Sequence, residues 1–182
     1  MSLLTLRHKL WRFVPALFLG TLLWFLWKGL VVEHPQTNHE MAFPAFSLGD
    51  VRTGHQPRSL ADLKGQISIV HIWASWCGIC VKEHEEWLRI KEKWPHSLVG
   101  IVYRDESDKV LNILAKKGDP YNYLLDDMSG SLGLDLGITG TPETFIVDKE
   151  GVIRFHHMGP VTQKTFEATF LPIIEKLNKD NA

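Results

Sequence analysis

Cysteine is scarce in this chain. Its 182 residues include two cysteines, Cys77 and Cys80, separated by two residues. With no third cysteine, the chain cannot form a network of structural disulfides, and each thiol has only the other as an intramolecular partner. A structural disulfide more often joins distant segments, because a longer closed loop restricts the unfolded chain more. The scarcity favours a pair that opens and closes over one that holds the fold together.

The sequence also lacks the ligand spacing of a zinc site. It has no second CxxC pair and no histidine pair at the usual spacing. Further ligands for a half-zinc site would have to come from histidines scattered along the chain: His71, His84, His156 and His157. We therefore expect no metal, and no cofactor beyond the redox-active disulfide Cys77–Cys80.

Neither sign of charge is in clear excess. The formal net charge of the whole chain is −1. Residues 41–182 carry 16 Lys and Arg (20 − 4) and 19 Asp and Glu (21 − 2), which gives −3. This mild acidic balance gives no indication of nucleic-acid binding. No internal repeat or low-complexity tract is visible.

One long hydrophobic run is present, near the N-terminus. Residues 13–27 are uncharged and mostly apolar, and with Lys28 reaching towards the interface the run extends to Val32. These 20 residues have about the length of a bilayer span. Basic residues precede the run (Arg7, Lys9 and Arg12), so the positive-inside rule places the N-terminus in the cytoplasm and the remainder outside.

This pattern predicts four parts: a cytoplasmic N-terminus (1–12), a transmembrane signal-anchor helix (13–32), a linker (33–42) and an exported domain (43–182). The rival interpretation is a cleaved signal peptide. The segment after the run, residues 28–32, has no convincing small-x-small cleavage site. The sequence therefore favours an uncleaved anchor.

The two cysteines lie where a buried strand gives way to a helix. Residues 67–73 are β-branched and apolar, whereas residues 77–94 are good helix formers that Pro95 stops. Cys77 is thus predicted at a helix N-terminus, where unpaired N–H groups and the helix dipole stabilise a thiolate. This position makes Cys77 the predicted nucleophile and Cys80 the resolving thiol.

Strand and helix patterns alternate through the rest of the domain. We expect strands over 46–48, 98–103, 121–125, 144–148 and 152–156, and helices over 60–64, 108–117 (capped by Ser107), 132–136 and 163–179 (capped by Thr162, with a kink or restart at Pro172). From the strand before the cysteines onward the order is β-α-β-α-β-β-α. It predicts an α/β sandwich, a central mixed β-sheet flanked by helices.

A glutamate shares a helical stripe with the resolving thiol. Five residues follow i, i+3, i+7, i+10, i+14 spacing: Cys80, Glu83, Trp87, Ile90 and Trp94. Three of them are apolar, so the stripe should face the sheet. Glu83 is then semi-buried beneath the thiols, where a carboxylate can exchange protons near neutral pH. It is a candidate base for the deprotonation of Cys80.

Three segments resemble one known family. Residues 73–84, residues 132–138 and the run Gly-Thr-Pro-Glu-Thr-Phe at 140–145 are similar to the DsbE/CcmG family of membrane-anchored thioredoxin-like thiol–disulfide oxidoreductases. The similarity covers nearly the whole chain. It implies a thioredoxin-like fold, a single-pass anchor in the bacterial inner membrane and a C-terminal domain in the periplasm.

The resemblance also implies a function. Members act as specific reductants of the haem-site thiols of apocytochrome c during cytochrome c maturation. The implied partners are therefore apocytochrome c or its haem-ligation machinery, together with a transmembrane electron donor of the DsbD/CcdA type. An alternative function is that of a reductant or copper-binding assembly factor for a copper chaperone or oxidase, because two thiols and nearby histidines suit Cu(I).

The resemblance adds further site residues around the cysteines. It implies that Pro142 is cis and faces the cysteine pair, and that Glu143 is a second functional acid. Because proline has no N–H, the backbone of Thr141 is left to pair with an extended substrate. Trp76 is expected at the rim of the site. These four residues, Trp76, Thr141, Pro142 and Glu143, form the predicted substrate-binding set, although Glu143 could instead only shape the groove.

Several polar residues lie outside the motifs described above. His71 in the central strand is either a proton relay to Cys80 or a satisfied core histidine. We interpret His156 and His157 as surface residues of the hairpin. The charges at residues 103–105 and 126–127 are interpreted as solvated loop residues.

Overall fold

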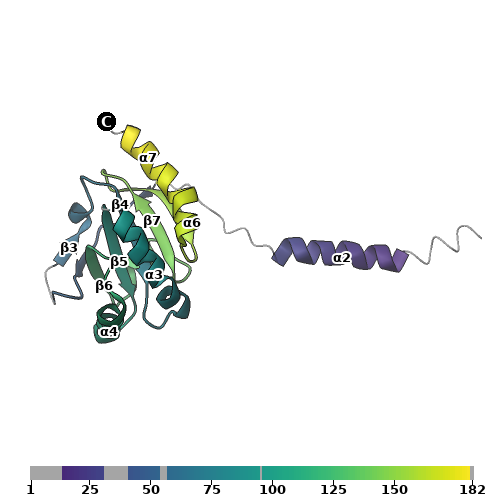
Figure 1. The fold of residues 1–182 in the computed structure, drawn as a ribbon, viewed down its shortest axis with the longest axis horizontal. Helices are drawn as coiled ribbons and strands as arrows, with labels where there is room; N and C mark the ends of the chain where they lie inside the picture. The colour runs from purple at the N-terminus through teal and green to yellow at the C-terminus, as the bar shows by residue number, and fades with distance from the viewer. Residues whose placement is uncertain (1–13, 31–40, 54–56, 95, 181–182) are drawn as a thin grey trace, which may run out of the picture. The chain divides into compact units, whose positions relative to one another are not determined.

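The structure is a computed structural model that describes residues 14–30, 41–53, 57–94 and 96–180 (Figure 1). The chain divides into two units, residues 1–34 and 35–182. In the first unit, helix α2 spans Val14–Leu30. Within the described ranges, no helix is both long and apolar enough to cross a bilayer. The predicted anchor extends beyond the described residues at both ends and stays a prediction.

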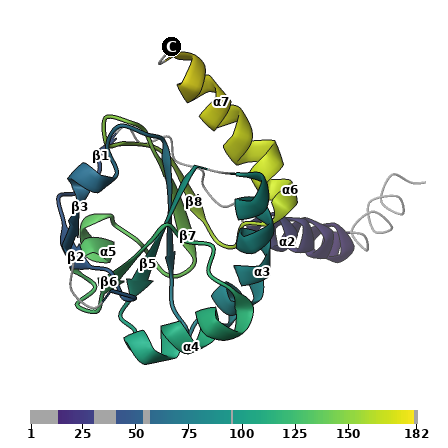
Figure 2. The same ribbon diagram turned by 60° about the vertical axis from the view of Figure 1, so that its left-hand side comes forward.

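The second unit is built on a six-stranded mixed sheet (Figures 1 and 2). β4, β5 and β6 are parallel, and β7, β8 and β1 continue the sheet antiparallel on the other side of β4. In sheet order the strands are β1 (Met41–Ala42), β8 (Val152–Met158), β7 (Glu143–Val147), β4 (Ser68–Trp73), β5 (Ser97–Tyr103) and β6 (Tyr123–Asp127). This confirms the predicted mixed sheet.

Smaller elements complete the unit. A two-stranded antiparallel sheet pairs β2 (Ser47–Gly49) with β3 (Pro57–Ser59), and a 3-10 turn follows at Leu60–Asp62. The helices are α3 (Gly78–Lys93), α4 (Ser107–Lys117), α5 (Ser131–Asp135), α6 (Gln163–Thr165) and α7 (Leu171–Asp180). Because β1 pairs with β8, Met41 and Ala42 belong to the sheet, and the ordered domain begins before the predicted boundary at residue 43.

Two hydrophobic clusters cover the two faces of the sheet. Alternate residues of a strand point to opposite faces, so Ile69 and Trp73 of β4 join the cluster under α3, whereas Val70 and Ile72 join the other cluster. The stripe on α3 is buried against the first cluster, as its spacing predicts. His71 lies between Val70 and Ile72, so its side chain points to the face that α3 covers.

Two local predictions need correction, and a third is confirmed with more detail. Ser107 is the first residue of α4 rather than its cap, and Glu106 occupies the cap position. The strand expected over 121–125 is shifted to Tyr123–Asp127. The final helix is divided: Thr162 caps α6 as predicted, but a π-helical turn, Phe166–Phe170, precedes α7, in which Pro172 is the second residue. Proline has no N–H to continue the helical ladder, so the helix restarts around it.

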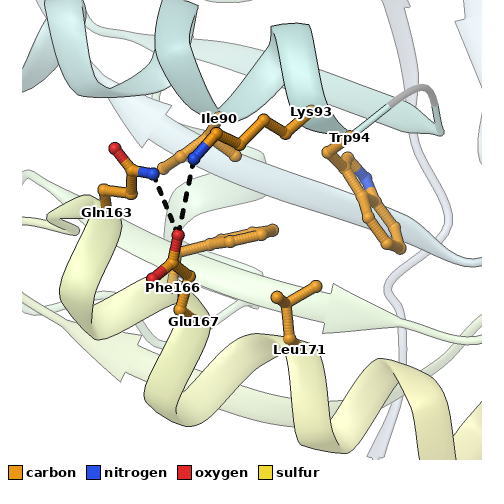
Figure 3. A pocket seen from close by; sticks show the side chains of 7 residues that line it. All are labelled: Ile90, Lys93, Trp94, Gln163, Phe166, Glu167 and Leu171. Atoms are coloured by element: carbon orange, nitrogen blue, oxygen red, sulfur yellow. Dashed lines mark hydrogen bonds and ion pairs between the residues drawn. The ribbon is translucent and has the colours of Figure 1, made fainter.

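The C-terminal helices pack on the end of α3 and enclose a small pocket (Figure 3). Its floor is apolar, and its rim carries an ion pair of 3.7 Å between Lys93 and Glu167. Ile90 in this pocket is ten residues after Cys80 on one helix, so the pocket lies about 15 Å from the cysteines. It is not part of the site around the disulfide.

Candidate redox site

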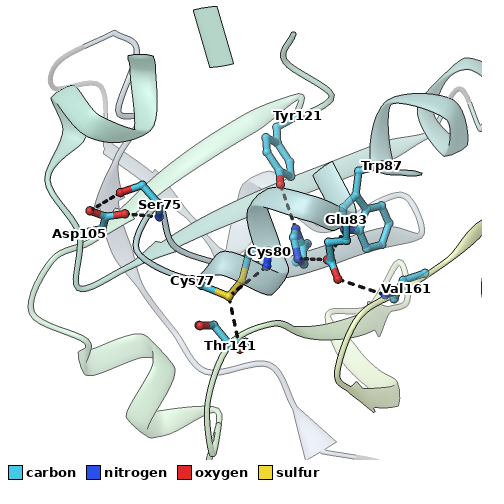
Figure 4. Close-up of a disulfide and its surroundings, with 10 residues drawn as sticks. Ser75, Cys77, Cys80, Glu83, Trp87, Asp105, Tyr121, Thr141 and Val161 are labelled. Carbon is cyan, nitrogen blue, oxygen red and sulfur yellow. Dashed lines mark hydrogen bonds and ion pairs between the residues drawn. A yellow bond between two sulfur atoms is a disulfide. The ribbon is translucent and has the colours of Figure 1, made fainter. Parts of the chain in front are cut away.

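The two cysteines form a disulfide at the start of α3 (Figure 4). Cys77 is the N-cap of the helix, and the backbone N–H of Cys80 donates to its sulfur at 3.1 Å. Cys77 is 7% exposed and Cys80 1%, so an incoming thiol or disulfide can reach only the first sulfur. The N–H donor and the helix dipole both stabilise a thiolate on Cys77 after reduction. This geometry agrees with the predicted nucleophile and resolving thiol.

The turn before the disulfide is held by the end of the neighbouring strand. The carboxylate of Asp105 accepts from the backbone N–H of Ser75 and, at 3.0 Å, from its hydroxyl. The indole N–H of Trp76 donates to the carbonyl of Arg104 at 3.1 Å. Asp105 is buried, so its interpretation as a solvated loop charge was wrong. Strand topology could have indicated its position: parallel β4 and β5 end at the same sheet edge, which brings Asp105 to the turn.

Trp76 lies at the rim of the site, as expected. Its side chain is 59% exposed, and that of Ile79, between the cysteines, is 54% exposed. The two side chains therefore border the disulfide with apolar surface.

The loop that faces the disulfide contains a cis peptide bond between Thr141 and Pro142, which confirms that prediction. The sulfur of Cys77 lies 3.6 Å from the carbonyl oxygen of Thr141 (Figure 4). In the disulfide this sulfur has no proton, so the approach is a contact; a reduced Cys77 thiol can donate to the same oxygen. Thr141 is partly exposed and Pro142 is buried.

Glu143 is buried behind this loop and does not line an open groove. One carboxylate oxygen accepts from the backbone N–H and hydroxyl of Thr139, both at 2.8 Å, and from the N–H of Gly140 at 3.1 Å. The other lies 2.6 Å from Nε2 of His156. Burial alone raises the pKa of Glu143, but hydrogen bonds from His156 and Thr139 outweigh it and hold the pKa below its usual value. One of its oxygens is thus occupied within its own loop and the other by His156 of β8.

The histidines of the hairpin are not surface residues, which corrects their interpretation. His156 stacks on Phe145 with ring centroids 4.2 Å apart and pairs with Glu143. His157 is buried and packs near Phe155 and Phe170. The C-terminal helices cover the face of β8 that carries His157, whereas the His156 side chain on the other face stays 12% exposed beside its partners Phe145 and Glu143.

Glu83 is buried more deeply than expected. Its carboxylate accepts from the indole N–H of Trp87 at 2.7 Å and from the backbone N–H of Val161 at 3.2 Å (Figure 4). Nε2 of His71 lies 2.8 Å from the same oxygen that Trp87 contacts. Glu83 follows Cys80 by one helical turn on the same face. Glu83 therefore lies one turn from the resolving thiol on the same helical face, and its carboxylate is shielded from water.

His71 is completely enclosed, at 1% exposure. Its Nδ1 is 2.9 Å from the hydroxyl of Tyr121, and its ring lies 4.8 Å from that of Trp87. Burial, followed by the nearby charge of Glu83, raises the pKa of Tyr121 well above its usual value. A connected row of polar groups thus runs from Tyr121 through His71 to Glu83. Sequence spacing alone missed Tyr121, which is 50 residues from His71.

The remaining candidates have structural partners. His84 is buried, its Nε2 lies 2.9 Å from the carbonyl of Gly118, and burial lowers its pKa. Asp127, interpreted as solvated, is buried and accepts from the N–H groups of Leu132 and Gly133 at the start of α5. In the part of the chain that the structure describes, no cluster of His, Cys, Asp or Glu side chains could hold a metal. The copper-binding alternative is not favoured.

Comparison with known proteins gives a consistent assignment. Residues 38–170 match the model of the Redoxin family. The chain is 36% identical over 156 residues to the thiol:disulfide interchange protein DsbE of Pseudomonas aeruginosa (84% of this chain, 86% of that one). It is 38% identical over 133 residues to DsbE of Allochromatium vinosum (73% and 74%).

A solved structure supports the same fold. A thiol:disulfide interchange protein of the thioredoxin family from Chlorobium tepidum matches with a TM-score of 0.59 and 27% identity, over 78% of this chain and 98% of that one. The thioredoxin-like α/β fold expected from the sequence is therefore confirmed, with its central mixed sheet flanked by helices.

Proposed function

The chain belongs to the redoxin family and to its DsbE group of thiol:disulfide interchange proteins, and on this premise we propose that it is a membrane-anchored periplasmic reductant of the haem-site thiols of apocytochrome c. That it is a thiol–disulfide oxidoreductase follows from its relatives and its CxxC disulfide. The client, the direction of electron flow and the location are the proposal.

The contact between the disulfide and the cis-proline loop carries this proposal. The reactive sulfur lies against the backbone of Thr141 on a loop whose outer edge is partly exposed. An extended segment can add to such a backbone as a strand, which presents its own cysteine to Cys77. Haem-site segments of apocytochromes are unfolded before ligation, so extended binding suits them.

The proposed cycle balances electrons and protons. The Cys77 thiolate attacks a disulfide of the client, or of its haem-ligation machinery, and expels one client thiolate. Cys80 loses its proton to Glu83 and attacks the Cys77 sulfur, which forms the Cys77–Cys80 bond and releases the second client thiolate. Two electrons pass to the client, whose two thiolates take up two protons. A transmembrane donor of the DsbD/CcdA type then returns two electrons to the pair.

The roles of the surrounding residues follow from this cycle. Glu83 is the base for Cys80, since it lies one turn away on the same face. Thr141 and Pro142 present the backbone edge, and Trp76 supplies apolar contact at the rim. Glu143 contributes to substrate binding indirectly, because it fixes the conformation of the loop through Thr139 and Gly140.

A trapping experiment tests the client. In a Cys80→Ser variant the mixed disulfide on Cys77 cannot be resolved, so the client stays covalently bound. We expect apocytochrome c or a component of its haem-ligation machinery to be captured in a periplasmic background. A Cys77→Ser, Cys80→Ser double variant is the control and should capture neither. Capture of many unrelated periplasmic proteins would contradict the proposed specificity.

Two further measurements test direction and location. The equilibrium potential of the Cys77–Cys80 couple against glutathione should be that of a reductant; a value near that of strong oxidants, about −120 mV, would reverse the proposed electron flow. Mass spectrometry of the mature N-terminus tests the anchor, for which the apolar run of residues 13–32 is the support. Loss of about the first 30 residues would show cleavage rather than anchoring.

A further inference from the structure

Four buried residues lie in one row behind the disulfide: Cys80, Glu83, His71 and Tyr121. We propose that His71 is a positioning residue of the resolving step, on which the proton of Cys80 comes to rest after Glu83 has taken it from the thiol. This inference deepens the proposed function and rests on the exchange chemistry of that site, but not on the identity of the client.

Glu83 by itself is a poor place for that proton to stay. Its carboxylate already accepts from the indole N–H of Trp87 and the backbone N–H of Val161, at 2.7 and 3.2 Å. A proton that remained on Glu83 would face these donors and weaken their bonds. The carboxylate is therefore suited to pass a proton on.

His71 is placed to receive the proton. Its Nε2 lies 2.8 Å from the Glu83 oxygen, within ion-pair distance. The structure holds the disulfide, the state in which Cys80 has already lost its proton. An imidazolium at this distance pairs directly with the Glu83 carboxylate, and this attraction offsets part of the cost of burying its charge.

Tyr121 sets which nitrogen of His71 can accept. Its hydroxyl lies 2.9 Å from Nδ1, and an Nδ1–H directed to that oxygen leaves Nε2 as the acceptor that faces Glu83. Burial raises the pKa of Tyr121 well above its usual value, so the phenol does not ionise and does not compete for the charge. The path of the proton therefore ends at His71.

The other groups that pack around His71 do not offer another site for the proton of Cys80. From α3, the indole of Trp87 and the imidazole of His84 approach its face of the sheet; burial lowers the pKa of His84, which keeps it neutral. Its neighbours in the sheet are the uncharged Gly100 on β5 and Thr144 on β7. Lys117 and Asp119 act on His84 from the end of α4 and the following loop. Of the described carboxylates, Glu83 is the one within ion-pair distance of His71.

The resolving step transfers one proton and exchanges one disulfide bond for another. The Cys80 S–H bond breaks, and its proton moves to Glu83 and then to Nε2 of His71. The thiolate electron pair forms the bond to the Cys77 sulfur while the bond from Cys77 to the client sulfur breaks. The client sulfur leaves with that electron pair and takes a proton from water. When the membrane donor reduces the disulfide, the proton returns from His71 to Cys80.

The resolving step can be measured on the full-length protein without a client. Reduced protein reacts with dithionitrobenzoate, which leaves thionitrobenzoate on Cys77, and Cys80 then releases the second thionitrobenzoate in a step followed by stopped-flow absorbance. In His71→Asn we expect this release to slow about tenfold at pH 7, less than the ~100-fold typical of removing a direct base. We expect the loss to vanish near pH 9, where a free cysteine ionises without help.

His84→Asn is the matched control, a second buried histidine whose replacement removes packing but no charge. It should lower stability without changing the pH profile of release. A His71→Asn rate that is reduced equally at every pH, or not reduced at all, would overturn the inference, because either result denotes a structural role only.

A second measurement does not depend on a folded variant. The ¹⁵N shifts of the His71 ring at pH 7 should report a cation in the disulfide form and a neutral ring in the dithiol form of the wild-type protein. A neutral ring in both forms would overturn the inference. Capture of unrelated clients by Cys80→Ser would instead overturn the proposed client and leave this inference standing.

Discussion

Two buried glutamates lie on opposite faces of one sheet, and their surroundings differ. Glu143 lies opposite Ile72 in the pairing of β7 with β4, so it shares the face of Ile72, whereas Glu83 lies with α3 on the face of His71. Four donors, three of them from its own loop, hold Glu143. Glu83 accepts from the indole N–H of Trp87, one turn further along α3, and from the backbone N–H of Val161, 78 residues away, and it faces a completely buried histidine.

The difference separates two uses of a buried carboxylate. Around Glu143 the hydrogen bonds outweigh burial and keep the group ionised, so its charge fixes a loop conformation. One partner of Glu83 is a histidine, a group that can share a proton. Under the proposed function, one face of the sheet holds the shape of the client groove, and the other face handles the proton of the resolving thiol.

The largest expected effect is on the rate of resolution. Glu83→Gln should slow the release of the second thionitrobenzoate by about 100-fold at pH 7, because the direct base for Cys80 is lost. Glu143→Gln is the matched variant and should leave this rate within about threefold, since its carboxylate faces the loop. Equal slowing in both variants would mean that the two faces of the sheet are not functionally distinct.

The second effect is on stability, where we expect replacement of Glu143 to cost more than replacement of Glu83. Glu143→Ala should lower the free energy of unfolding by about 3 kcal/mol, because the buried donors of Thr139, Gly140 and His156 lose their acceptor. Urea denaturation measures this loss. Glu83→Gln keeps the size and an acceptor, and should lower it by about 1 kcal/mol. A Glu143→Ala protein as stable as wild type would remove the loop-anchoring role.

The third prediction is the pH dependence of the stability that Glu143 contributes. The pKa of Glu143 is lowered in the folded state from a value near 4.5. Its stabilisation is therefore fully present above pH 4.5 and disappears as the pH falls through the lower folded-state value. Denaturation of wild type and Glu143→Gln between pH 7 and 3 should show the gap between them narrowing only at the acidic end. A gap that stays constant would contradict an ionised Glu143.

A smaller effect on stability should come from the turn before the disulfide, which contains Ser75. Asp105→Ala removes the acceptor for the N–H and hydroxyl of Ser75 and should cost about 2 kcal/mol of stability. Glu106→Ala, next to it on the exposed surface, is the control and should cost less than about 0.5 kcal/mol. Thermal denaturation of the two variants decides whether Asp105 supports the turn or is dispensable.

The smallest stability effect should be at the exposed rim. Trp76→Ala should change the free energy of unfolding by less than about 0.5 kcal/mol, because its side chain lies mostly in solvent. The same change should reduce the yield of trapped client in the Cys80→Ser background, since the apolar contact surface is lost. Unchanged trapping would exclude Trp76 from client binding.

Much of this site is local in the chain and could be read from it. The strand before Cys77, the helix after it, and the stripe that joins Cys80 to Glu83 depend on spacing within one or two turns. The cis bond before Pro142 was expected only through the family resemblance, because no local rule selects it. The positions of Asp105, Asp127, His156 and His157 were misread, since a charged or polar residue in a loop or on a strand carries no local signal of burial.

Sequence by itself determined the cysteine pair, its place at the start of a helix, and the alternation of strands and helices, because each depends on neighbours within a strand or a helix. Tertiary structure alone decided which polar groups meet: His71 with Tyr121, Ser75 with Asp105, and Glu143 with His156. Those contacts join residues 50, 30 and 13 positions apart. They follow from strand order and register, which set the distances between side chains that spacing along the chain leaves open.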